Sequence, residues 1–256
     1  MFVACSTLCF AREPLETALR QIVELEFDKY ELALVEGGRH ISPSEAGDNP
    51  DAALYRLRQG PSLIASSLHI DFGPINWADA RTRTRFDGLC KLAKLLSVAV
   101  VTIPASPLGT PLDDEIKRLA ALVAQTMSEG LVLSLQTHSQ TLTSLPKTAA
   151  ELCRAVPGLG LTLDPSHFIQ AGDPNVDFNV VYPYVQNVQL RDTGPGPGEF
   201  QVKVGQGKIE YAQVVAQLER YGYNRALCVS IIDRVENNFD REVEIRKLKL
   251  LLETLL

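Results

Sequence analysis

The sequence predicts a single (β/α)8 TIM barrel over residues 1–256, and two observations support this fold class. First, eight short apolar runs alternate with longer amphipathic stretches, as in buried parallel strands that are each followed by a helix. Second, no linker or low-complexity segment interrupts the alternation, and 256 residues is an ordinary length for one barrel. A doubly wound open sheet is the main alternative, but no Gly-x-Gly-x-x-Gly turn follows the first apolar run.

The expected strands are short, rich in Val, Leu and Ile, and bounded by Gly, Pro or Asp, as in fully buried parallel sheets. They comprise residues 2–6, 30–35, 64–70, 99–105, 131–137, 159–164, 185–190 and 226–231.

The expected helices lie between the strands and repeat apolar residues every three or four positions. Pro14 in a first turn, Asp113 and Asp114 at another helix start, and Gly130 at its end are helix-terminus signals. The clear patterns span residues 13–26, 79–97, 113–130, 148–156, 210–222 and 241–256, with weaker ones around 52–59 and 176–184.

Composition excludes several classes of function. A net charge of −6 argues against nucleic-acid binding, because phosphate contacts need a basic surface. The five cysteines show no metal-type or disulfide spacing, which indicates reduced, buried thiols. The first ten residues, MFVACSTLCF, lack the basic flank and apolar length of a signal peptide or membrane span. We therefore expect a cytoplasmic protein without membrane or nucleic-acid partners, and the sequence leaves a homo-oligomer open.

Histidines gather where the strands of the predicted barrel end, which is where barrel enzymes build their active sites. His69, His138 and His167 lie at or just past strand ends, and His40 lies in a loop on the same face. Chance would favour neither end of the barrel, so the clustering favours a functional site over ordinary loop histidines. Asp164 ends the sixth strand three residues before His167, so one exit turn can aim both side chains at a common point.

Other carboxylates near this face have open roles. Glu31 alternates with apolar neighbours, so it faces either the barrel mouth or an internal ion-pair partner. Asp192 and Asp233 fit helix capping as well as they fit a site.

The motifs at the strand ends resemble the xylose isomerase-like barrels, a family that includes sugar phosphate isomerases and epimerases and, distantly, endonuclease IV. The resemblance is densest over residues 130–230, in the stretches LVLSLQTH, GLTLDPSHFIQAGDP, VQNVQLRD and GYNRALCVS. It implies a divalent metal held by Glu, Asp, His and Glu at the ends of strands five to eight. It also implies that the two glutamates move a proton between adjacent sugar carbons.

At these positions three of the four residues implied by the resemblance are neutral. Gln136 and Ser230 stand at both expected catalytic glutamate positions, and Gln189 stands at the histidine position. Only Asp164, with its companion His167, is kept. Amides and hydroxyls do not ionise near pH 7, and they are weak ligands for divalent ions. The resemblance therefore predicts an eroded metal site.

The histidines provide a different set of candidate metal ligands. His69, His138 and His167 with Asp164 would suit Zn²⁺ or another divalent ion such as Mn²⁺, Co²⁺ or Mg²⁺. A cluster of satisfied polar groups without any cofactor is the equal alternative.

Three functions follow from these residues. One is a sugar isomerase or epimerase that uses His138 or His167 as its proton carrier. Another is a non-catalytic barrel that binds a sugar or polyol through neutral groups, namely His69, Gln136, Gln189 and Ser230 with the other histidines. The third is an endonuclease IV-like nuclease, which the acidic balance and the missing glutamates disfavour.

Further ligand contacts are expected nearby. Arg191 is suited to an anionic or hydroxyl group of a substrate, and Trp77 is suited either to a wall over a sugar ring or to a core contact. The backbone of Gly205 to Gly207 could hold a phosphate, or these glycines could simply shape the entry to the next helix.

Overall fold

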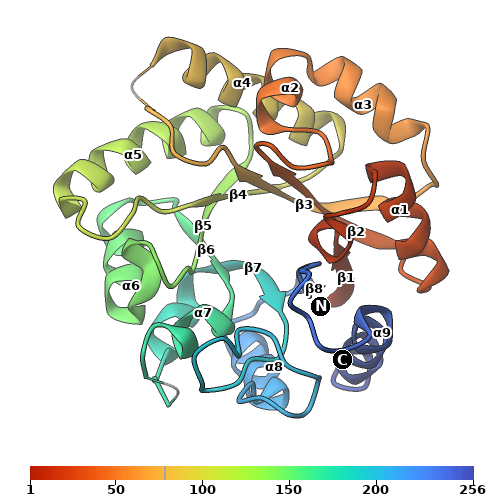
Figure 1. The fold of residues 1–256 in the computed structure, drawn as a ribbon. Coiled ribbons are helices and arrows are strands. Elements are labelled where there is room, and N and C mark those ends of the chain that lie inside the picture. The colour runs from red at the N-terminus through yellow and green to blue at the C-terminus, as the bar shows by residue number, and fades with distance from the viewer. Residues whose placement is uncertain (78, 174) are drawn as a thin grey trace.

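The computed structural model describes residues 1–77, 79–173 and 175–256 and confirms the predicted barrel. In these residues eight parallel strands follow one another around a closed sheet, in chain order, with β8 paired to β1 (Figure 1). The strands are β1 (Phe2–Ser6), β2 (Lys29–Val35), β3 (Ile64–Asp71), β4 (Val100–Pro104), β5 (Val132–Gln136), β6 (Gly160–Leu163), β7 (Val185–Leu190) and β8 (Ala226–Val229).

Helices surround the barrel on its outer side (Figure 1). Within the described residues they are α1 (Leu15–Glu24), α2 (Pro43–Asp48), α3 (Pro50–Arg58), α4 (Ala80–Leu95), α5 (Leu112–Ser128), α6 (Pro146–Ala155), α7 (Pro165–Gln170), α8 (Tyr211–Arg220) and α9 (Arg241–Glu253). Three short 3-10 segments join them: η1 (Thr7–Phe10), η2 (Leu142–Ser144) and η3 (Asn179–Tyr184).

The connection after β6 differs from the helix predicted around residues 176–184. Its α-helical part, α7, begins immediately after the strand, and residues 179–184 form only the 3-10 segment η3. Pro183 lies inside that segment, and a proline cannot donate the backbone hydrogen bond that an α-helix needs at that position. The result places His167 in a short helix directly above the end of β6.

The residues expected to mark the start and the end of α5 have different roles in the structure. Asp113 and Asp114 lie in the first turn, where they favour the positive end of the helix dipole, but the N-cap is Pro111 and makes no side-chain cap. Gly130 follows the helix with φ of 74°, a conformation that glycine adopts without strain.

Polar side chains at alternate strand positions point into the barrel and contact one another. The hydroxyl of Thr162 lies 2.7 Å from that of Thr102 and 2.8 Å from that of Ser134. Gln136 lies two residues beyond Ser134 on β5, so it belongs to a second polar layer nearer the carboxyl ends of the strands. The intervening Leu135 is fully buried in the apolar core.

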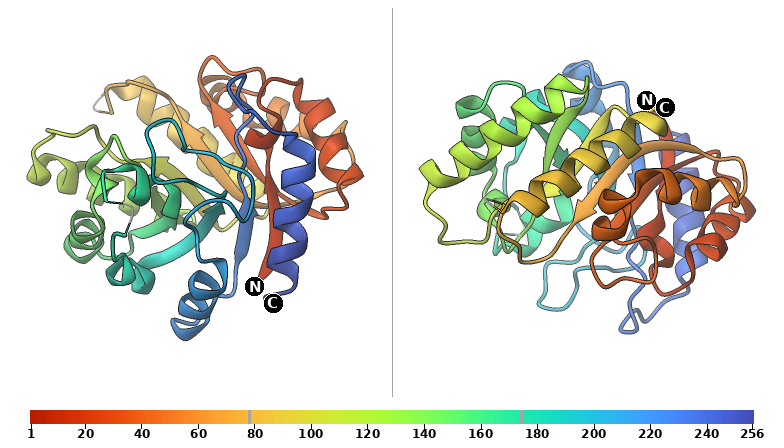
Figure 2. Two further views of the ribbon diagram at one scale, coloured as in Figure 1. Left: turned by 60° about the horizontal axis from the view of Figure 1, so that its bottom comes forward. Right: turned by 90° about the horizontal axis from the view of Figure 1, so that it is seen from above.

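The two chain termini lie side by side at the opposite end of the barrel from this second polar layer (Figure 2). The last helix, α9, packs against β1 and β8. No helix in the described part of the chain is long and apolar enough to cross a bilayer.

Candidate functional site

A cavity of about 790 Å³ opens at the carboxyl ends of β3, β4 and β5, and we call it the mouth cavity. Its volume is in the range of small-molecule sites. A second cavity, of about 450 Å³, lies outside the barrel between η3 and α8 and has no strand-end residue in its lining. The mouth cavity is the better candidate because barrels of this kind act at the carboxyl ends of their strands. Its lining includes Asp71, Phe72, Trp77, Arg118, Gln136, His138, Gln140 and Thr141.

Trp77 makes the core contact that was one of the two roles expected for it, and it also lies at the mouth cavity. It lines the mouth cavity, and its ring also packs edge-on against Phe72 and Phe86 with centroids 5.7 and 5.6 Å away. The guanidinium of Arg118 lies 5.3 Å from the Trp77 ring centroid. Glu115 holds that guanidinium through two hydrogen bonds of 2.7 Å, so the arginine brings little net charge to the cavity.

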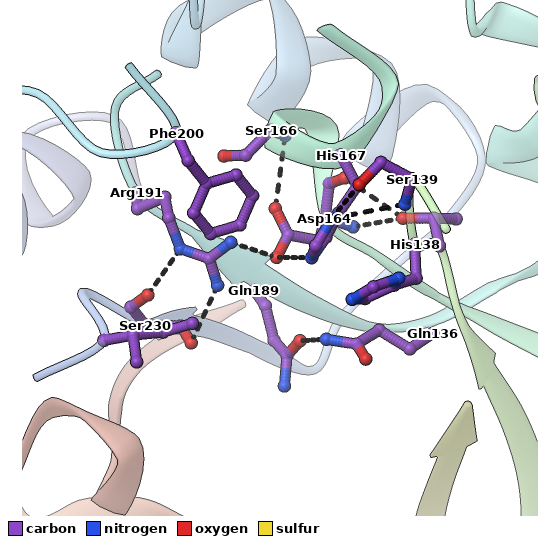
Figure 3. Close-up of polar contacts among 12 residues, drawn as sticks. Gln136, His138, Ser139, Asp164, Ser166, His167, Gln189, Arg191, Phe200 and Ser230 are labelled. Atoms are coloured by element: carbon purple, nitrogen blue, oxygen red, sulfur yellow. Dashed lines mark hydrogen bonds and ion pairs between the residues drawn. The ribbon is translucent and has the colours of Figure 1, made fainter. Parts of the chain in front are cut away.

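The side chains of His138, at the end of β5, and His167, in α7, lie against each other with their rings tilted by 35° (Figure 3). Their ring centroids are 4.1 Å apart. The backbone N–H of Gln140 donates to Nδ1 of His138 at 3.2 Å, and that of Ser139 donates to Nδ1 of His167 at 3.3 Å. Because Nδ1 is the acceptor in both rings, the neutral form of each carries its proton on Nε2.

Burial keeps these two imidazoles neutral. It lowers the pKa of His138, and it lowers the pKa of His167 well below the usual value, with His138 and Arg191 adding to the effect. Each ring therefore offers an Nε2–H donor at neutral pH, and only His138 lines the mouth cavity.

Asp164 is fully buried and is paired with an arginine (Figure 3). Its Oδ2 lies 2.6 Å from Nη1 of Arg191, which makes a buried ion pair. The backbone N–H of Ser166 donates to Oδ1 at 3.1 Å and so caps α7. Nε2 of His167 is 3.7 Å from Oδ2, beyond hydrogen-bonding distance. Burial raises the pKa of Asp164, although Arg191 and Ser166 oppose that change.

Arg191 and Ser230 face each other rather than the mouth cavity. Nε of Arg191 donates to the Ser230 carbonyl at 2.7 Å, and Nη2 donates to the Ser230 hydroxyl at 3.2 Å. The guanidinium also lies 4.7 Å from the ring centroid of Phe200, and that of Arg234 lies 4.9 Å from the same centroid. Only 1% of Arg191 is exposed, so the arginine expected to meet a substrate is enclosed by protein.

A chain of hydrogen bonds crosses the barrel beneath the mouth cavity. Gln136 donates from Nε2 to Oε1 of Gln189 at 2.9 Å, and Gln189 donates from Nε2 to Oε1 of Glu31 at 2.7 Å. Asn187 and Ser67 donate to Oε2 of Glu31 at 2.8 and 3.0 Å. Glu31 thus meets neutral donors, and within the described residues it forms no ion pair, contrary to one of its two expected roles.

Most of the predicted site residues fall into two groups in the structure. Trp77, Gln136 and His138 line the mouth cavity. Towards β6 to β8, the other group is Asp164, His167, Arg191 and Ser230, enclosed by their own contacts. His69 and Gln189 lie within the barrel, where Nδ1 of His69 is 3.4 Å from Nε2 of Gln189.

His40 lies apart from both groups. Its Nε2 is 3.2 Å from the carbonyl oxygen of Phe10, and burial lowers its pKa. This imidazole therefore behaves as a satisfied loop residue.

Sequence reasoning missed Phe200, Arg118 and Ser139. Phe200 covers Arg191 from within a Gly- and Pro-rich loop, where no periodicity marks which side chain folds inward. Arg118 lies in the middle of α5 and looks like any helix cation. Ser139 acts through its backbone N–H, which no sequence motif reveals.

The glycines of the loop before α8 do not offer free donors for a phosphate. The N–H groups of Gly205 and Gly207 donate to Oδ2 of Asp192 at 2.7 and 3.0 Å. The N–H groups of Thr193 and Ile209 donate to Oδ1 at 3.0 and 3.4 Å. Asp192 therefore organises this loop, and a side chain at Gly207 would collide with its carboxylate.

The closed barrel, with polar side chains gathered at its carboxyl end, is typical of small-molecule enzymes and binders. The model of the xylose isomerase-like TIM barrel family matches residues 19–252, and the chain belongs to that family. A protein of Methanocaldococcus jannaschii named uncharacterized protein MJ1311 is 23% identical over 251 residues, covering 88% of this chain and 81% of that protein.

Solved structures share the fold over nearly the whole chain. A D-tagatose 3-epimerase-like protein superposes with a TM-score of 0.73 at 22% identity, covering 100% of this chain and 98% of the other. A xylose isomerase-like TIM barrel protein from Mycobacterium smegmatis, in complex with magnesium, superposes with a TM-score of 0.76 at 16% identity. The match covers 99% of this chain and 97% of the other. At these identities the likeness establishes the fold alone.

The side chains at the positions expected to bind the metal do not fit a divalent ion. The carboxylate of Asp164 is already paired with a guanidinium, and the amides of Gln136 and Gln189 are bonded in series. Among residues 1–77, 79–173 and 175–256, no three His, Cys, Asp or Glu side chains are grouped so that they could hold a metal ion. This includes the alternative set of His69, His138, His167 and Asp164.

Proposed function

We propose that this protein binds a sugar or polyol in the mouth cavity without a divalent metal and without moving a proton on its ligand. The observation that carries the proposal is the ion pair between Arg191 and Asp164. The arginine brings a permanent positive charge to the one carboxylate retained from the family's metal-binding pattern. A guanidinium is always protonated, so this charge needs no bound ion.

The hydrogen-bonding state of the histidines supports binding over proton abstraction. A general base needs an accessible lone pair, and in both His138 and His167 the lone pair at Nδ1 already accepts a backbone N–H. The neutral Gln136 and Ser230 at the expected glutamate positions cannot take up a proton near pH 7. We therefore do not assign His138 or His167 the proton-carrying role that the sequence suggested for them.

The lining of the mouth cavity supports a hydroxyl-bearing ligand. His138 offers an Nε2–H donor, and Gln136 has its donor engaged with Gln189, which leaves its carbonyl oxygen as an acceptor. A hydroxyl group both donates and accepts, so one hydroxyl or a neighbouring pair can satisfy both side chains. Trp77 provides an aromatic surface for the C–H face of a sugar ring.

Ligand screening in the presence of a chelator tests the proposal. A ligand at one hundred times its Kd stabilises the folded state by about 2.7 kcal/mol, which raises the Tm by several degrees. We expect such a rise with at least one sugar or polyol when EDTA is present. A broad panel without any hit, or a hit that needs added Mg²⁺, Mn²⁺, Co²⁺ or Zn²⁺, would contradict the proposal.

Variants locate the binding site. Gln136→Leu removes one neutral hydrogen bond, worth about 0.5–1.5 kcal/mol, and should weaken binding roughly twofold to tenfold. Gln213→Leu, in the lining of the second cavity, is the matched control and should leave affinity unchanged. Equal losses in both variants would place the ligand elsewhere.

Incubation of the ligand with protein in D₂O separates binding from catalysis. A sugar that undergoes isomerisation or epimerisation through proton transfer exchanges a carbon-bound hydrogen for deuterium, which proton NMR detects. We expect no exchange above the buffer rate. Exchange that disappears in His138→Asn would instead restore the isomerase prediction.

A further inference from the structure

We propose that Glu31 is a positioning residue that sets the hydrogen-bonding direction of two side chains, Gln136 in the lining of the mouth cavity and His69 within the barrel. Through Gln189 it makes Gln136 present an acceptor and His69 present an Nε2–H donor. The ligand-recognition part of this inference rests on the proposed function, whereas the hydrogen-bond directions can be measured without any ligand.

Glu31 is the fixed end of this series of hydrogen bonds. It is fully buried, and its two oxygens receive the hydrogen bonds of Ser67, Asn187 and Gln189 described above. An ionised carboxylate can only accept hydrogen bonds. Each of the three partners must therefore turn a donor toward it.

Gln189 passes this direction on to Gln136. With its amide nitrogen toward Glu31, Gln189 must turn its carbonyl oxygen toward β5. The amide nitrogen of Gln136 donates to that carbonyl oxygen at 2.9 Å. Its Oε1 is then the end that remains for the mouth cavity, and it accepts no hydrogen bond from the described residues. Reversing either amide would bring two acceptors face to face.

The same amide nitrogen of Gln189 fixes the tautomer of His69. It carries a second N–H, and it lies 3.4 Å from Nδ1 of His69. An amide nitrogen cannot accept a hydrogen bond, so Nδ1 of His69 must be the acceptor. The proton of the neutral ring then sits on Nε2.

The consequence is a constraint on the ligand class. Gln136 can bind only a group that donates a hydrogen bond, so it selects a free hydroxyl and rejects an ether or a carbonyl at that point. The imidazole of His138, which lines the same cavity, selects an acceptor. A polyol with neighbouring free hydroxyls fits this arrangement, and a methyl ether at the hydroxyl that meets Gln136 does not.

NMR of protein labelled with ¹⁵N at histidine tests the inference on the full chain. Long-range proton–nitrogen correlations distinguish a protonated from an unprotonated ring nitrogen, and the spectrum of His69→Gln assigns the signals. We expect wild-type His69 to be a single tautomer protonated at Nε2. A proton at Nδ1, or a mixture of tautomers in the wild type, would overturn the inference directly.

The variant Glu31→Gln tests whether Glu31 is the cause of the single His69 tautomer. A glutamine side chain can donate as well as accept, so the amide of Gln189 loses its fixed direction and the single His69 tautomer should be lost. If Glu31→Gln fails to fold, Gln189→Met cuts the same chain while keeping Glu31, and it should have the same effect on His69. Glu244→Gln changes a buried glutamate of α9 and should leave the His69 signals unchanged.

An unchanged His69 tautomer in the folded Glu31 or Gln189 variant would also refute the positioning role. The test is separate from that of the proposed function. If wild-type His69 is protonated at Nε2 as expected but no sugar or polyol binds, only the proposed function is refuted.

Discussion

At the scale of single residues, the buried pair of Arg191 and Asp164 distinguishes the end of this barrel. Its charge is compensated by Asp164 at 2.6 Å inside the protein, and neither side chain is more than 1% exposed. Removing one partner of such a pair leaves the other charge buried alone, whereas removing both often has little effect.

Arg191→Met should therefore destabilise the fold by about 3–5 kcal/mol, because Asp164 loses its counter-charge. The double variant Arg191→Met with Asp164→Asn should recover much of that loss. Urea unfolding monitored by circular dichroism measures both. Lys117→Met, which breaks an exposed pair with Asp114, is the control and should change stability by less than about 1 kcal/mol. A double variant as unstable as the single one would argue against the pair.

The buried histidines make stability depend on pH. The pKa values of His40, His138 and His167 are all lowered in the folded state, chiefly by burial. Below about pH 6.5 the unfolded chain therefore binds more protons than the folded one, so stability falls as the pH is lowered into this range. Each such proton contributes up to about 1.4 kcal/mol per pH unit.

Urea unfolding at pH 7 and pH 5 should thus show lower stability at pH 5, and His167→Asn should reduce the difference. The raised pKa of Asp164 acts in the opposite sense, since its folded form binds the proton more readily. A pH dependence that His167→Asn leaves unchanged would mean that the ring accepts a proton freely in the folded state.

At the scale of elements, the loop between β7 and α8 is organised by one carboxylate. Asp192 accepts from four backbone N–H groups of the loop. The same loop carries Phe200 over Arg191, so its order and the enclosure of the ion pair are linked.

Asp192→Ala should lower hydrogen-exchange protection across residues 193–209 and cost about 1–3 kcal/mol, since several N–H groups lose a charged acceptor. Hydrogen exchange followed by mass spectrometry measures the protection. The control Asp177→Ala removes a carboxylate with one backbone partner, the N–H of Asn179, and should leave the loop unchanged. Full protection in Asp192→Ala would show that the glycine-rich loop holds its shape by itself.

Secondary structure was predictable to the extent that local pattern determines it. Each strand was found because both of its faces are buried, which favours short runs rich in Val, Leu and Ile even where polar residues such as Gln189 alternate with them. The structure of the connection after β6 was not predicted correctly, because Pro183 limits residues 179–184 to a 3-10 segment, which no apolar periodicity marks.

The site was predictable only in part, because its contacts are distant in sequence. The convergence of Asp164 and His167 follows from one exit turn and could be expected. The pairing of Asp164 with Arg191 requires the relative position of two strand ends. The partners of Glu31 are further still, since Asn187 is 156 positions away.

At the scale of the whole molecule, the positive charge beside Asp164 comes from the side chain of Arg191. The stability of the fold should therefore not depend on a metal. Thermal unfolding in EDTA and in added Zn²⁺, Mn²⁺, Co²⁺ or Mg²⁺ should give the same Tm. A bound ion would raise the Tm with its concentration, because it binds only the folded state. A rise that is lost in Asp164→Asn or His167→Asn would restore the predicted metal site.

The enclosed arginine also constrains how this barrel could change by mutation. A glutamate introduced at Ser230 would arrive beside the Arg191 guanidinium, which already donates to the Ser230 hydroxyl, and would be drawn into an ion pair with it. A path back to metal chemistry must therefore remove Arg191 before the acidic ligands can serve a metal, and that first step leaves Asp164 uncompensated. Such a path would meet a loss of stability before any gain of activity.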